Sequence, residues 1–84
     1  MRIYELTPID GRASFYGKAK VIESENGDMT LLSYNTEVCK VTADGEVKRL
    51  WSGESQTTTR HFNAFMDFCG INKQGLAEWR KLSF

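Results

Sequence analysis

The sequence predicts an α+β fold, a small curled antiparallel meander of three to five strands covered by one main helix at about residues 58–69. Two observations lead to this prediction. Short runs that suit β-strands are separated by turn signals, of which Asn-Gly and Asp-Gly are the strongest. Further along, apolar residues recur at the spacing of one helix face. A short second helix, at about residues 73–82, is expected to follow.

The first strand is expected within Met1–Leu6. It should stop before Pro8, because proline cannot donate a hydrogen bond to a strand ladder. Asp10-Gly11 marks a turn. The following segment, Arg12–Tyr16, fits either one turn of helix or a loop that pins its aromatic residues on the core.

Lys18–Ser24 is predicted to be an edge strand, because lysines and a glutamate flank its apolar residues. Asn26-Gly27 then favours a two-residue hairpin turn, since both positions of such a turn need a positive φ. Met29–Tyr34 is the expected return strand of this hairpin.

Thr36–Thr42 is rich in β-branched residues and is also predicted to be strand. Only Tyr34 and Asn35 stand between it and the preceding run. Two residues without a glycine suit a tight turn poorly, so we expect residues 29–42 to form one long strand bent by a β-bulge. Two separate strands are the alternative.

Asp44-Gly45 signals a second hairpin of the same kind, leading into a strand at Glu46–Trp51. Because side chains alternate along a strand, its two faces should differ. One face carries Val47, Arg49 and Trp51, and the other carries Lys48 and Leu50.

The main helix is expected to have Thr57 or Thr58 as its N-cap and to end at Gly70, where a left-handed residue can stop it. Its inner face carries large apolar side chains, namely Phe62, Phe65, Met66 and Cys69. One flank of that face adds His61, Ala64 and Phe68, and the side expected to face water carries Arg60, Asn63 and Asp67. In the second helix, Asn72 is the expected cap, and one side carries Leu76, Trp79 and Leu82.

The 84 residues suit a single domain, residues 1–84. The chain has 11 basic and 11 acidic residues and no formal net charge, which argues against a strongly cationic nucleic-acid binder. Its first residues lack a signal-peptide pattern, and no apolar run is long enough to span a bilayer. A cytoplasmic protein without a membrane partner is therefore expected.

The common enzyme signatures are absent from the sequence. Cys39 and Cys69 lack the spacing of a zinc site and are predicted to be buried free thiols. A nucleophile–base pair of His61 with either cysteine would lack a recognisable orienting acid. The acidic residues that could meet across the first hairpin alternate with lysines, as on a solvated surface, and these are Glu23, Glu25, Asp28 and Glu37. We expect no catalytic residue, metal, cofactor or small-molecule substrate.

The start of the main helix carries the most suggestive polar cluster, formed by Ser55, Thr57, Thr58, Thr59, Arg60 and His61. Free N–H groups at a helix N-terminus, together with hydroxyls, a guanidinium and an imidazole, would suit an anion such as a phosphate. Alternatively, the threonines only cap the helix and His61 packs at the rim of the sheet.

Two further groups of side chains are candidates for binding. The basic pair Lys48 and Arg49 would add phosphate contacts to the cluster at the helix start. Tyr34 and Trp51, with Trp79, could stack on unpaired bases or anchor a protein interface. The alternative for the aromatic residues is that they fill the core of a small domain.

Three short sequence motifs, considered together, indicate a resemblance to a known family. Pro8–Gly11 precedes Ser14–Tyr16, and Ser33–Thr36 has the form Ser-Tyr-x-Thr. A Ser-x-Thr-Thr-x-x-His segment is formed by Ser55, Thr57, Thr58 and His61. This combination resembles a family of small uncharacterised proteins common in bacteriophages and mobile elements of Gram-positive bacteria. The resemblance covers most of the chain, implies the helix-on-sheet fold and a phage or mobile-element origin, and carries over no catalytic residue.

The sequence therefore predicts a non-catalytic small binding protein that acts through a protein partner or by self-association. Charge neutrality and the abundance of Trp and Tyr favour this prediction. The alternative is a nucleic-acid-binding accessory protein that uses Arg60 and His61 together with Lys48 and Arg49.

Overall fold

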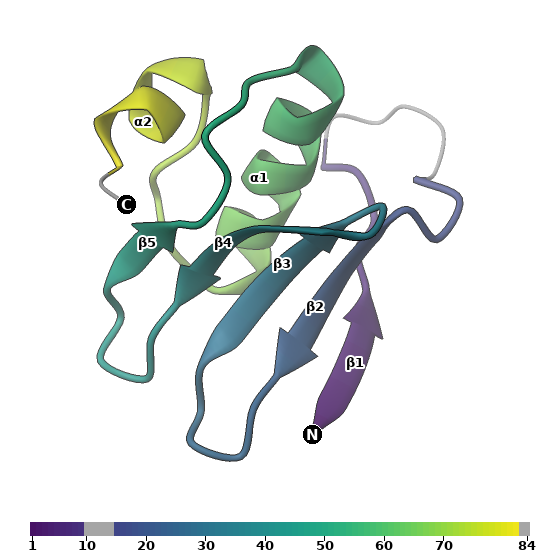
Figure 1. Ribbon diagram of the computed structural model, residues 1–84, viewed down its shortest axis with the longest axis vertical. Coiled ribbons are helices and arrows are strands. Elements are labelled where there is room, and N and C mark those ends of the chain that lie inside the picture. Colours follow the sequence, from purple (N-terminus) through teal and green to yellow (C-terminus); the bar gives the residue numbers. More distant parts are fainter. Residues whose placement is uncertain (10–14, 83–84) are drawn as a thin grey trace.

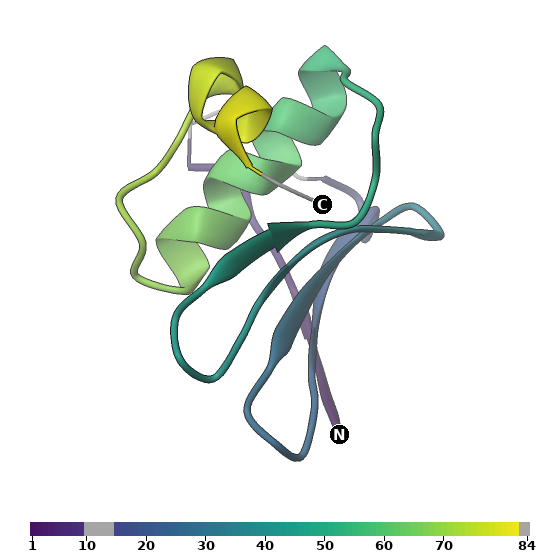
Figure 2. The ribbon, with the colours of Figure 1, turned by 60° about the vertical axis from the view of Figure 1, so that its left-hand side comes forward.

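The computed structural model describes residues 1–9 and 15–82, and it confirms the predicted α+β fold. A five-stranded antiparallel sheet carries both helices on one of its faces (Figures 1 and 2). The strands are β1 (Arg2–Glu5), β2 (Ala19–Glu23), β3 (Met29–Ser33), β4 (Thr36–Val41) and β5 (Val47–Arg49). The helices are α1 (Gln56–Phe68) and α2 (Leu76–Lys81). The turn expected at Asp10-Gly11 and the part of Arg12–Tyr16 before Phe15 lie outside the described residues.

The strands follow one another across the sheet in the order β1-β2-β3-β4-β5, so the edges are β1 and β5. The prediction that Lys18–Ser24 forms an edge strand is therefore wrong. Strand β2 pairs with β1 on one side and with β3 on the other. Its lysines do not mark an edge, because Lys20 points to the exposed face while Ala19 and Val21 are fully buried beneath the helix.

The chain turns sharply at Tyr34 and Asn35, so the expectation of one long bent strand over residues 29–42 is also wrong. Strands β3 and β4 pair antiparallel, and Ser33 lies opposite Thr36. Tyr34 adopts a φ of 57°, a left-handed conformation that is unusual for a bulky residue. Its backbone N–H donates to the carbonyl of Lys18 at 2.7 Å, which extends the β2–β3 ladder up to the turn. A bulge does occur, but it lies within the β3–β4 pairing, between Leu31 and Leu32.

Both glycine hairpins form where predicted, with loops one residue longer than expected. The N–H of Ser24 donates to the carbonyl of Asp28, and the N–H of Thr42 donates to that of Glu46. Each pair therefore encloses three residues, and the last of them is Gly27 or Gly45 with positive φ. This geometry suits a turn followed by a left-handed glycine and needs a positive φ at one position only.

Helix α1 begins earlier than predicted, and its N-cap is Ser55 instead of Thr57 or Thr58. The Ser55 hydroxyl accepts a hydrogen bond from the N–H of Thr58 at 3.0 Å. The other end agrees with the prediction, because Gly70 has a φ of 71° and lies directly after the C-cap. The N–H of Ile71 donates to the carbonyl of Met66, which completes a Schellman stop.

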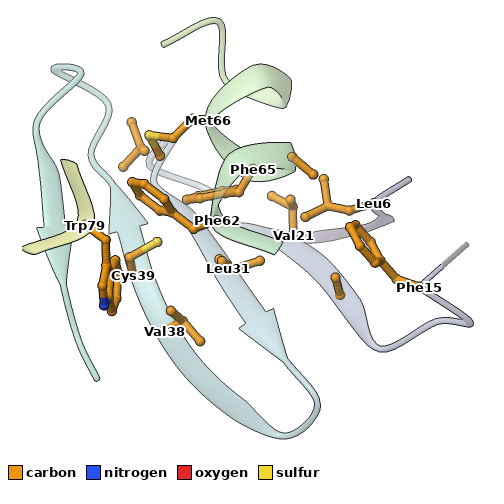
Figure 3. Close-up of a cluster of buried hydrophobic side chains, with 13 residues drawn as sticks. Leu6, Phe15, Val21, Leu31, Val38, Cys39, Phe62, Phe65, Met66 and Trp79 are labelled. Carbon is orange, nitrogen blue, oxygen red and sulfur yellow. The ribbon is translucent and has the colours of Figure 1, made fainter. Parts of the chain in front are cut away.

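The inner face of α1 packs on the sheet as predicted (Figure 3). Phe62, Phe65 and Met66 are fully buried in the core cluster that also contains Val21 of β2 and Leu31 of β3. Burying each of these large side chains contributes about 1.5–3 kcal/mol, so this layer dominates the core. Phe68, predicted at the flank of the helix face, is 40% exposed and contacts Tyr4 at the rim, where the ring centroids are 5.3 Å apart.

Helix α2 is shorter than predicted, since it starts at Leu76 and Asn72 does not cap it. Gly75 precedes it with a φ of 100°, and its backbone N–H donates to Asn63 Oδ1 at 2.7 Å. Asn63 was expected to face water, but this hydrogen bond ties α1 to the start of α2. The expected inner side is correct, because Trp79 is buried and both leucines of that side pack against the core.

Candidate functional site

A hollow of about 280 Å³ lies where the N-terminus of α1 meets the β3–β4 turn. We call it the hydroxyl pocket, and it is lined by Ser33, Tyr34, Thr36, Val38, Trp51, Glu54, Ser55 and Thr58. Its volume is slightly below the range of about 300–1,000 Å³ that is usual for small-molecule and cofactor sites. The pocket therefore has room for one ring or one side chain of a ligand.

A buried hydrogen bond lies directly behind the pocket. The hydroxyl of Ser33 and Nδ1 of His61 are 2.8 Å apart, and His61 is only 1% exposed. Phe15 packs edge-on against the imidazole with ring centroids 4.5 Å apart. Burial, and to a lesser extent the charge of Arg60, lower the pKa of His61. The imidazole is therefore neutral at pH 7, and it positions Ser33 at the pocket wall.

Trp51 forms one aromatic wall, and several neighbours hold it in place. A side chain at Gly53 would overlap the six-membered ring of Trp51, so only glycine admits the ring at this position. Trp79 packs on its side with ring centroids 6.5 Å apart. The guanidinium of Arg49 donates to the backbone carbonyl of Trp51 at 2.9 Å and to those of Ser52 and Gly53. The half-buried indole is thus a rigid part of the surface.

Tyr34 forms the second aromatic wall and is 56% exposed. Its ring centroid lies 6.0 Å from that of His61, and the Lys18 ammonium lies 5.7 Å from it. A left-handed conformation costs a bulky residue about 1–2 kcal/mol, which asparagine or glycine would largely avoid. The fold alone therefore gives no reason for a tyrosine at this turn.

The helix cap supplies hydroxyl groups to the pocket. The hydroxyls of Ser55 and Thr58 are 2.8 Å apart and share one hydrogen bond. Two hydroxyls have two protons, so one O–H remains available to an acceptor in the pocket. Thr58 is only 9% exposed, which places this donor in a largely dry position.

The structure brings together part of the predicted site. Tyr34, Trp51, Ser55 and Thr58 line the hydroxyl pocket, and His61 lies behind its wall. Thr57 is exposed on the first turn of α1 and does not line the pocket.

Other parts of the pocket were not predicted. Ser33 and Thr36 belong to its lining, and Gly53 lies against the ring of Trp51. Ser33 and Thr36 are the two ends of the Ser-Tyr-x-Thr motif, but local sequence contained no signal that this motif meets the helix start.

The predicted basic residues are dispersed. Arg49 is buried on the helix side of the sheet, with its guanidinium 4.3 Å from the ring of Trp79. Lys48 projects from the opposite, exposed face. Arg60 lines an adjoining hollow of about 420 Å³, which shares Glu54 and Ser55 with the hydroxyl pocket. Its guanidinium lies over the ring of Phe15 at 5.2 Å. The four basic side chains assigned to nucleic-acid binding therefore do not form one patch.

The cysteines are free, as predicted, although Cys69 is only half-buried. Burial raises the pKa of both thiols, and that of Cys69 reaches about 11. Neither is therefore a thiolate nucleophile at neutral pH. Of the acidic residues, Asp28 accepts from the backbone N–H of Ala43 and lies 3.7 Å from the Lys40 ammonium. Within residues 1–9 and 15–82, no three metal-ligating side chains converge.

Residues 4–81 match the model of a family of unknown function, DUF8033. The chain belongs to this family. The DUF8033 match runs from within β1 to the end of α2 and includes every residue of the hydroxyl pocket. Neither the curated proteins nor the solved structures contained a match to the chain. In the part of the chain that the structure describes, no helix is long and apolar enough to cross a membrane.

Proposed function

We propose that this DUF8033 protein is a non-catalytic binding protein that acts through a protein partner or by self-association. The observation that supports it best is the pair of aromatic walls, Tyr34 and Trp51, around the hydroxyl pocket. Tyr and Trp side chains that remain accessible beside a hollow are typical anchors of protein interfaces.

The neighbourhood of the pocket supports recognition more than catalysis. The Ser33–His61 pair combines the side chains of a possible nucleophile and general base, but the imidazole is enclosed by the rings of Phe15 and Tyr34. A catalytic histidine is normally oriented by a carboxylate or another polar group on its second nitrogen. The structure gives His61 aromatic neighbours, which suit a histidine that holds two segments together.

A protein partner has more support than a nucleic acid. Affinity for nucleic acid comes largely from phosphate contacts made by clustered lysines and arginines. Here the chain has no net charge, and Lys48 lies on the opposite side of the sheet from Arg60. The guanidinium of Arg49 is buried and donates to backbone carbonyls, so it does not offer a surface contact to a phosphate.

Self-association has support of its own from the face of the sheet that neither helix covers in Figure 2. Ile3 of the edge strand β1 is 61% exposed on this face and lies beside the half-buried Ile22. Leu50 is also exposed, and Leu32 is half-buried. A second copy could cover these apolar side chains.

The origin and location of the protein belong to the same proposal. The Ser-Tyr-x-Thr and Ser-x-Thr-Thr-x-x-His motifs support an origin in a phage or mobile element of a Gram-positive bacterium. A product of such an element would act in the cytoplasm of the host cell. Sequencing the genomic neighbourhood tests this part, because flanking genes for integration, replication or virion assembly are expected.

Affinity capture from a Gram-positive bacterial lysate tests the binding function. The wild-type protein should retain a partner in stoichiometric amount, and Tyr34→Ala should lose it. Lys73→Ala is the matched control, since this exposed side chain lies in the α1–α2 connection, away from the pocket and the sheet, and it should retain the partner. Sedimentation velocity of the purified protein tests self-association. A monomer that captures no protein, or a capture that nuclease abolishes, would contradict the proposal.

A further inference from the structure

We propose that the hydroxyl pocket binds an extended, proline-containing segment of the partner protein in the polyproline II conformation. This inference rests on the proposed function and specifies the chemistry of the partner. Polyproline II segments dock into grooves lined by aromatic side chains, where a prolyl ring packs against ring faces and side-chain donors reach the peptide carbonyls. The pocket offers both features.

The aromatic walls are held in place before a ligand arrives. Gly53 leaves space for the ring of Trp51, and Trp79 supports that ring from the side. The backbone of Tyr34 is fixed by the tight β3–β4 turn and by its hydrogen bond to Lys18. Walls that need little ordering on binding favour a ligand that is itself stiff, because both partners then lose little conformational entropy. A polyproline II segment is such a ligand.

The charge of the pocket favours an uncharged ligand. Glu54 is the only charged side chain among the lining residues. Its carboxylate already accepts two hydrogen bonds from the guanidinium of Arg80, at 2.8 and 3.1 Å. The remaining lining consists of hydroxyls, aromatic rings and Val38. A lysine, arginine or phosphate placed here would lose water without gaining a free counter-charge.

The hydrogen-bonding groups of the pocket suit peptide carbonyls. The Ser55–Thr58 pair has one spare O–H, and within the described residues the indole N–H of Trp51 has no acceptor. Both groups are donors. The carbonyls of a polyproline II segment are free because the helix has no internal hydrogen bonds, and proline brings no N–H that would need an acceptor.

Titration of the isotope-labelled protein with acetylated decaproline, followed by NMR, tests this proposal. The Trp51 indole N–H and the backbone of Thr36 and Thr58 should shift saturably, with a dissociation constant of about 1 mM or below. A Gly-Ser decapeptide should bind at least about tenfold more weakly, because it lacks the stiff prolyl rings. Cellotriose and a decathymidine oligonucleotide serve as probes for a glycan or nucleic-acid ligand.

Two variants and a matched control assign the binding to the pocket. Tyr34→Ala removes one wall, and it should weaken decaproline binding about tenfold or more, the size expected for truncating an aromatic anchor. Gly53→Ala should have the same effect by displacing the Trp51 ring. Tyr16→Ala is the control, since Tyr16 is also an exposed tyrosine with positive φ (53°) but does not line the pocket. Its binding should change by less than about twofold.

Four results would overturn the proposal: no saturable shift, equal binding of the Gly-Ser peptide, unchanged binding by a folded Tyr34→Ala, or preferential binding of cellotriose or decathymidine in the pocket. Near-ultraviolet circular dichroism shows whether each variant keeps its packing. If capture of a partner depends on Tyr34 but decaproline does not bind, the protein-binding function stands and the polyproline II segment is ruled out.

Discussion

Acidification is a direct test of the buried Ser33–His61 contact. His61 is the only histidine of the chain, and its pKa is lowered mainly because burial disfavours the charged imidazole. In the unfolded chain its pKa returns to about 6.5. Below that pH the unfolded chain binds a proton that the folded chain does not. The free energy of unfolding should therefore be constant above about pH 6.5 and fall as the pH drops toward the lower folded pKa.

The size of the effect follows from the number of protons. One histidine can change the free energy of unfolding by at most about 1.4 kcal/mol per pH unit. A small domain is stable by only about 5–15 kcal/mol, so a slope of this size is measurable. Urea unfolding followed by circular dichroism, at several pH values between about 5 and 7.5, gives the slope directly. In this window the carboxylates of the unfolded chain are already ionised and contribute little.

The variant His61→Asn provides the control. Its side-chain amide can still pair with Ser33 but does not titrate, so the protein should be less stable at pH 7 and its stability should not depend on pH in this window. A wild-type protein without a slope below about pH 6.5, or a His61→Asn variant with the same slope, would refute the argument that His61 is buried in its neutral form.

Two further predictions concern the helix cap and the thiols. Ser55→Ala should reduce the free energy of unfolding by about 1 kcal/mol, because the N–H of Thr58 loses its acceptor. Thr57→Ala, at an exposed position of the same turn, should be nearly neutral. Equal effects of the two substitutions in urea unfolding would contradict the assignment of Ser55 as the cap. Alkylation of the native protein, measured by mass spectrometry, should be slow for both cysteines at about pH 8. As the pH approaches 11, the rate should increase first at Cys69, because its thiol is less buried and its pKa is raised less than that of Cys39. Labelling of Cys39 before Cys69 would contradict the observed burial.

Local patterns predicted the elements that depend on neighbouring residues. The apolar spacing of Phe62, Phe65 and Met66 identified the inner face of α1, and Gly70 marked its end. The glycine hairpins were also found, because a left-handed residue is needed wherever they turn. The β3–β4 turn was missed, since a tyrosine in the left-handed conformation is locally unfavourable. The turn is held by the pairing of β3 with both β2 and β4 and by the hydrogen bond from the N–H of Tyr34 to Lys18.

The candidate site was predicted only in part for a related reason. Tyr34, Trp51, Ser55 and Thr58 were chosen for their chemistry, but nothing local placed the Ser-Tyr-x-Thr turn beside the helix cap. Arg49 was assigned to a basic surface. The strand pattern shows that Arg49 and Trp51 share one face of the strand, but it does not show that this face points toward the core.

By itself the sequence determined the fold class, the main helix and the strand segments, because hydrophobic periodicity and turn residues act over a few positions of the chain. Only the tertiary structure decided which strands lie at the edges, that Arg49 points inward, and that Ser33 meets His61 behind a pocket with two aromatic walls. These are contacts between residues far apart in sequence. They depend on the order and curvature of the whole sheet, which no local pattern specifies.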